Sequence, residues 1–201
     1  MKTLDVYNHF GIPQNLREHM LRVTRVGILI SDQWKETIDR DLIIKAGLVH
    51  DLANIVKFKL EPGSSLEAKQ KEMIAKYGSN DHDATAKMLH ELGVDEKLIE
   101  IVQGKSFGNA IEVAVSTNWP LKILFYSDMR VVPTGVVDLE TRLNDVVTRL
   151  EKYRNDPNKD KLIESAREVE KQIQEKTAMD LSKINVKLVA EGMEQLLGFE
   201  I

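Results

Sequence analysis

The sequence contains no cysteine among its 201 residues. This absence excludes structural disulfides, thiolate metal sites and cysteine nucleophiles. Any metal that the protein binds must therefore be held by nitrogen and oxygen ligands, which histidine and carboxylate side chains supply.

Long apolar runs are also missing. No stretch approaches the roughly 20 apolar residues of a membrane-spanning helix, and the first residues, MKTLDVYNHFGI, lack the apolar segment of a signal peptide. We therefore expect a cytoplasmic protein without a membrane partner. The formal net charge of −4 gives no general attraction to nucleic acid, although a local basic patch remains open.

Several motifs of well-known enzyme classes are absent as well. The segment GKSFGN does not match a phosphate-binding Walker loop, which would also have to follow a strand. The sequence has neither an HExxH zinc motif nor a GxSxG nucleophile elbow. None of these three classes is therefore indicated.

Helical periodicity, by contrast, is present almost throughout, with apolar residues recurring at spacings of three and four. No alternating run predicts a strand, and 42% apolar residues suffice for a sizeable core, so we predict an all-α fold. The predicted helices run from Asn15 to Ile30, from Asp39 or Asp41 to His50, from Leu66 to Tyr77, from the end of YGSND to Leu92 before Gly93, over 95–103, and from Pro120 to Asp128.

Three further amphipathic segments follow the breaker PTG at 133–135. They are marked by apolar residues over 139–150, over 162–173 and over 184–197. We predict a domain over 1–135 and a C-terminal helical extension over 136–201 that packs on it. The stripe over 162–173 has 4-3-4 spacing, which suits packing within the chain or against a second copy, so a homodimer remains open.

Four polar residues stand where the hydrophobic pattern points inward. His19 precedes Val23 by four residues, and His50, at the end of an apolar helix, is followed directly by Asp51. Asp128 closes the apolar stripe of the helix from Pro120. Because isolated buried charges are very costly, one cation shared by two imidazoles and two carboxylates would account for all four.

Each of these residues also has an ordinary explanation. A His–Asp pair is a common chance dipeptide, and a single inward histidine is usually a hydrogen-bonded core residue. Asp128 could form an ion pair with Arg130 or cap the end of a helix. The spacing pattern alone therefore suggests a metal site without establishing one.

The ordered set His19, His50–Asp51 and Asp128 resembles the H…HD…D signature of the HD superfamily of metal-dependent phosphohydrolases. The resemblance covers roughly residues 9–135 in the family's order, and the combination is more specific than any of its members. It extends to the longer segments LREHMLRVTRV, AGLVHDLAN, DHDATAKMLHELGV and LFYSDMRV.

The resemblance implies an HD-type helical bundle in which these four side chains bind one divalent metal ion, with Mn, Fe, Ni, Co, Zn and Mg all open. Many relatives hold a second metal through two more histidines. His82 matches one of them, but the other falls near the end of EIVQGKSF, where Lys105 stands closest. The sequence also departs after the HD pair, where Ala53 and Asn54 replace the Gly–Lys or Glu often found there.

The implied activity is hydrolysis of a nucleotide or a related small phosphate ester, mono- or diester, through a metal-activated water. Asp51 and His82 are the expected catalytic residues, although His82 could also be a helix-terminal residue in water. For the cationic candidates the alternative is a solvated surface charge, and Asn54 could merely end a helix. The expected substrate-binding residues are Asn54, Lys57, His82, Lys105 and Arg130.

The departures from the family's pattern keep a second function open. Without the second-metal histidine and the usual residues after the HD pair, the protein could be a catalytically weak or inactive ligand-binding or regulatory module. An intact set of four ligands favours the enzyme, because a pure binding module has little reason to keep His19 and Asp128.

Overall fold

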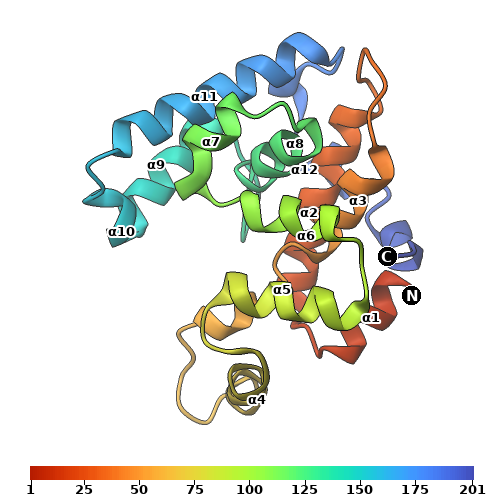
Figure 1. Ribbon diagram of the computed structural model, residues 1–201, viewed down its shortest axis with the longest axis vertical. Helices are drawn as coiled ribbons and strands as arrows, with labels where there is room; N and C mark the ends of the chain where they lie inside the picture. Colours follow the sequence, from red (N-terminus) through yellow and green to blue (C-terminus); the bar gives the residue numbers. More distant parts are fainter.

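Helices form nearly all of the regular structure in the computed structural model, which describes residues 1–201 (Figure 1). The predicted all-α fold is confirmed. The α-helices are α1 (Thr3–His9), α2 (Gln14–Ser31), α3 (Arg40–Val49), α4 (Glu67–Tyr77), α5 (Asp81–Leu92), α6 (Glu96–Gly104), α7 (Ala110–Val115), α8 (Trp119–Asp128), α9 (Leu139–Arg149), α10 (Glu151–Arg154), α11 (Lys159–Lys176) and α12 (Val186–Ala190). The remaining elements are the short 3₁₀ helices η1 (Asn54–Lys57), η2 (Phe107–Asn109), η3 (Leu181–Lys183) and η4 (Glu194–Gly198), and the strands β1 (Val131–Val132) and β2 (Gly135–Val136).

Local sequence explains where many of these helices begin. Short polar side chains precede them and accept a hydrogen bond from a main-chain N–H of the first turn, which has no partner inside the helix. Gly93 ends α5 in the left-handed conformation that only glycine adopts without strain, with φ of 68°. The residues that cap in this way are Asp39, Asn80, Asp95, Asn118, Asp138 and Asn185.

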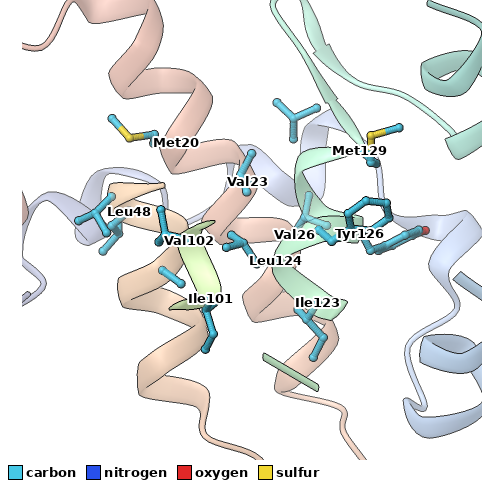
Figure 2. Packing of buried hydrophobic residues seen from close by; sticks show 14 of the residues in the cluster. Met20, Val23, Val26, Leu48, Ile101, Val102, Ile123, Leu124, Tyr126 and Met129 are labelled. Atoms are coloured by element: carbon cyan, nitrogen blue, oxygen red, sulfur yellow. The ribbon is translucent and has the colours of Figure 1, made fainter. Parts of the chain in front are cut away.

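The central packing involves α2, α3, α6 and α8. Helix α3 contacts all three of the others, and α8 contacts α2 and α6 as well. Figure 2 shows how their apolar side chains meet between the helices. The residues labelled there include Met20, Val23 and Val26 of α2, Leu48 of α3, Ile101 and Val102 of α6, and Ile123 and Leu124 of α8, all of which are buried.

The long helix α11 lies along one side of the molecule, beside α7 and α8 (Figure 1). The 4-3-4 stripe of α11 is buried within the chain, against these helices. The chain then returns toward α2, and α12 contacts both α2 and β2. The stripe therefore lies in the common hydrophobic core, whose members on α11 are Leu162, Ala166, Val169 and Ile173.

Two local predictions need correction, and the predicted break at 133–135 takes a more definite form. The helix expected from an Asn15 cap begins at Gln14, with Pro13 at the N-cap position and no capping side chain. The PTG breaker forms the turn of a small antiparallel hairpin, in which Val131 pairs with Val136. The segment over 184–197 is not one helix, because α12 ends after five residues and Gly192 adopts a φ of 78° before η4.

The two chain ends lie close together (Figure 1). The main-chain N–H of Ile201 donates to the carbonyl of Met1, and the N–H of Thr3 donates to that of Phe199. No helix in the structure has both the length and the apolar composition needed to cross a membrane. The homodimer stays an open possibility, and the domain boundary at residue 135 stays a prediction.

Candidate metal centre

Four polar side chains from three elements meet beside the central helices. His19 lies in the second turn of α2, and His50 and Asp51 directly follow α3. Asp128 is the last residue of α8. The pairwise packing of α2, α3 and α8 brings these three chain segments together. The side chain of His50 is fully buried, and the other three are largely buried.

The polar atoms of these residues lie within a few ångströms of one another. Nε2 of His19 is 3.3 Å from Nε2 of His50 and 3.2 Å from Oδ1 of Asp128. Oδ2 of Asp51 is 3.6 Å from Nε2 of His19 and 3.8 Å from Nε2 of His50. One ligand atom each from His19, His50 and Asp128 fall within 4.8 Å of one another, with Asp51 beside this group.

The orientation of His50 is fixed by its own helix. Its Nδ1 donates a hydrogen bond of 2.7 Å to the carbonyl oxygen of Gly47, three residues earlier. In the neutral imidazole this leaves a lone pair on Nε2, which faces Nε2 of His19. A lone pair directed at a second ring nitrogen and at carboxylate oxygens needs a cation or a proton between them.

Two further residues hold the carboxylates. Lys105, directly after α6, donates from Nζ to Oδ1 of Asp51 at 2.7 Å and to Oδ2 of Asp128 at 3.0 Å. Asn54 donates from Nδ2 to Oδ2 of Asp51 at 2.7 Å. The carboxylate oxygens opposite Lys105 are thus the ones that face the imidazoles.

Charge controls the protonation of this cluster. Burial alone would raise the pKa of Asp51 and of Asp128, but the adjacent Lys105 and the two histidines lower it further than burial raises it. The pKa of both carboxyls therefore lies below the usual range. Burial would lower the pKa of Lys105, yet the two carboxylates raise it overall. At neutral pH the cluster thus holds two carboxylates and an ammonium group.

The donor set fits a divalent transition-metal ion. Metal–ligand bonds of about 2.0–2.2 Å place neighbouring ligand atoms about 3.0 Å apart in octahedral and about 3.4 Å apart in tetrahedral geometry. The separations of 3.2–3.8 Å in this cluster are close to those values. Imidazole nitrogen together with carboxylate oxygen suits Mn, Fe, Co, Ni or Zn.

Neither His82 nor Lys57 makes a hydrogen bond or an ion pair to the side chains of this cluster. His82 is in the first turn of α5, half-buried, and its main-chain carbonyl accepts a hydrogen bond from Gln103. Burial lowers the pKa of His82, and its charge interacts with those of Lys105 and Asp51. Lys57 is exposed and forms an ion pair of 2.7 Å with Asp81.

Two expected substrate contacts need correction. Lys105 is buried, and its ammonium group is already engaged by Asp51 and Asp128. Arg130 is also buried, and its guanidinium donates to the hydroxyl of Tyr126 and to main-chain carbonyls over 137–184. Both cations are therefore engaged by partners within the chain, and neither has a free donor face for a phosphate group.

The comparison with protein families decides the assignment. The family model of the HD domain matches residues 16–164, which include all four side chains of the cluster. The chain belongs to the HD superfamily. No curated protein and no solved structure matches it.

Membership of the HD superfamily agrees with the all-α fold and with a family of divalent-metal-binding proteins that are generally hydrolases. The match extends beyond residue 135, through α9 and into α11. What the sequence did not indicate is how Lys105 serves the HD site. The sequence shows that Lys105 follows Gly104, but not that it contacts two carboxylates. That contact depends on how α6 packs against α3 and α8.

Proposed function

We propose that this HD-superfamily protein is a metal-dependent phosphohydrolase that acts on a nucleotide or a related small phosphate ester. The observation that supports this proposal is the meeting of two imidazole nitrogens and two carboxylate oxygens, with His50 fixed in the tautomer that a metal ligand needs. Family membership supports the reaction class.

His19, His50, Asp51 and Asp128 would hold one divalent ion. Such an ion lowers the pKa of a bound water and takes up negative charge on a phosphoryl oxygen. The chain supplies the rest of the environment. Asp51 contributes a carboxylate that stays ionised, because its pKa is lowered by Lys105 and the imidazoles in spite of burial. As a ligand held in one orientation by Lys105 and Asn54, this carboxylate can orient the water.

Asn54 and His82 would contact the substrate or the water. The Oδ1 atom of Asn54 is buried and has no hydrogen-bond partner in the chain, so it can accept a hydrogen bond from a water or a substrate hydroxyl. Because burial lowers the pKa of His82, its imidazole is neutral at neutral pH and suited to accepting a proton. Lys57, exposed beside Asp81, is the remaining cationic candidate for phosphate.

A second candidate function is a ligand-binding module without turnover. Lys105 favours it, because its ammonium group gives both carboxylates a partner even when no metal is bound. The two candidates differ in one measurable property. The enzyme hydrolyses a phosphate ester when loaded with metal, whereas the module binds a phosphorylated ligand and leaves it intact.

The proposal is tested by metal content and by hydrolysis of a generic phosphate ester and a panel of nucleotides with Mn²⁺, Co²⁺, Ni²⁺ and Mg²⁺. We expect His50→Ala and Asp51→Ala each to lose bound metal and to lower turnover at least about 1,000-fold, because each removes a ligand. Retained metal and unchanged turnover in both variants would refute the proposal.

His90→Ala is the matched control. His90 lies at the C-terminal end of α5, with a half-exposed side chain next to Glu96, and it takes no part in the cluster. We expect this variant to keep both metal and turnover, so that a loss in His50→Ala reports the site and not the mere removal of an imidazole.

A further inference from the structure

Lys105 divides the four carboxylate oxygens of the candidate metal centre into two pairs. Its Nζ contacts Oδ1 of Asp51 at 2.7 Å and Oδ2 of Asp128 at 3.0 Å. The other two oxygens, Oδ2 of Asp51 and Oδ1 of Asp128, are the ones near His19. A single ammonium group therefore lies on one side of the carboxylate pair, and the imidazoles lie on the other.

The ammonium group is a permanent part of this arrangement. The side chain of Lys105 is 8% exposed, and its two partners are 11% and 19% exposed. Moving it away would leave two buried carboxylate oxygens without a partner, which is strongly unfavourable. A role in which Lys105 leaves the carboxylates to follow a substrate phosphate is therefore disfavoured.

The charges of the two carboxylates and of Lys105 favour the binding of one divalent ion and not two. Two carboxylates and one ammonium group carry a net charge of −1, which one divalent ion on the imidazole side changes to +1. A second divalent ion shared by the same carboxylates would need the two oxygens that Lys105 already occupies. It would also lie next to two other positive charges, which is unfavourable in a buried site.

We propose that Lys105 is a built-in cation that limits this site to one divalent metal ion. It does so by occupying Oδ1 of Asp51 and Oδ2 of Asp128. It is a positioning residue, because it acts on the ligands and not on the substrate. The inference rests on the proposed function in one respect, namely that Oδ2 of Asp51 and Oδ1 of Asp128 bind a metal. It goes further by assigning the residue that keeps the number of ions at one.

The test is the number of Mn²⁺ ions bound per chain, measured on the full-length protein by native mass spectrometry and by Mn²⁺ electron paramagnetic resonance. We expect one ion in the wild-type protein. We expect two in Lys105→His, which removes the charge and adds a neutral nitrogen ligand beside the freed oxygens. The two close ions would then give the spectrum of a coupled pair, a signal that a merely structural role would not produce.

Two variants serve as controls. Lys105→Arg keeps the positive charge and should bind one ion. Lys152→His adds an imidazole at an exposed position on α10, away from the cluster, and should also bind one ion. If Lys105→His does not fold, Lys105→Ala, which removes the charge and leaves room for an ion, is expected to bind the second ion in its place.

The outcomes separate this inference from the function on which it rests. Two ions in the wild-type protein, or one ion in both folded charge-removing variants, would overturn the role of Lys105 while leaving the metal-dependent function intact. A wild-type protein that binds no ion would overturn the proposed function, and the role of Lys105 with it.

Discussion

The side chain of Asp51 illustrates how neighbouring residues prepare a ligand. Its Oδ1 is held by Lys105 and its Oδ2 by Asn54, each at 2.7 Å, so the carboxylate has a fixed orientation relative to the two histidines. His50 is held in the same manner by the carbonyl oxygen of Gly47. Partners of this kind orient the ligands, which contributes to metal affinity.

At this scale we predict that Asn54→Ala weakens metal binding about 10–100-fold, because Asp51 loses the donor that orients Oδ2. Isothermal titration with Mn²⁺ measures the effect. Asn158→Ala, at an exposed position before α11 where the side chain makes no capping bond, should leave the affinity unchanged. Equal affinities in Asn54→Ala and in the wild-type protein would contradict this role.

At the scale of the elements, the crossing of α2 and α3 sets the distance between the two histidines. Gly47 of α3 packs directly on Thr24 of α2, and a Cβ atom at Gly47 would lie 2.6 Å from Oγ1 and 3.0 Å from Cα of Thr24. Since part of this contact is main chain, the helices could accept a methyl group only by moving apart. His19 precedes Thr24 in α2 and His50 follows Gly47 at the end of α3, and their Nε2 atoms meet at 3.3 Å, close to this crossing.

Gly47→Ala is therefore predicted to lower the free energy of unfolding by about 1–3 kcal/mol and to weaken metal binding as well, since α2 and α3 would separate. Urea denaturation and Mn²⁺ titration measure the two effects. Gly198→Ala is the control, because a Cβ there meets no atom within 4 Å. A Gly47→Ala variant with wild-type stability and affinity would show that the crossing is not tight.

At the scale of the whole molecule, the C-terminal segment is bound to the helices that carry the site. Arg130, two residues after Asp128, donates to the main-chain carbonyls of Leu181 and Ile184 and to the hydroxyl of Tyr126. Thr177 donates from Oγ1 to the carbonyl of Ile30 in α2. These bonds connect the end of α11 and the segment after it to α2 and α8.

We predict that Arg130→Met lowers the free energy of unfolding by about 2–4 kcal/mol, because several buried acceptors lose their donor at once. Metal affinity, measured where the variant is folded, should stay within about twofold of the wild type. Urea denaturation is the measurement, with Arg149→Met as the control at a half-exposed position on α9, expected to change stability by less than about 0.5 kcal/mol. Loss of metal without loss of stability would point instead to a role in the site.

Much of the helical framework could be predicted from the sequence. Asp39, one of the two aspartates predicted to start a helix, caps the start of α3, and Gly93 ends α5 as predicted. Helix α8 begins at Trp119, one residue before the predicted Pro120, with Asn118 as its cap. Such local effects do not depend on the rest of the chain. The segment over 184–197 could not be predicted in the same way. Its apolar residues suit a helix, but burial against α2 and the turn at Gly192 divide it.

The sequence by itself determined that the protein is helical and that no thiolate takes part in its chemistry. It also determined that His19, His50 and Asp128 stand on or at the edge of apolar faces, with Asp51 next to His50. These properties depend on residue type and on spacing within one helix. Only the tertiary structure decided which partner each buried cation has. Lys105 meets Asp51 and Asp128, whereas Arg130 turns to the C-terminal segment. Such pairings join residues from helices distant in sequence, so they depend on how those helices pack and not on local spacing.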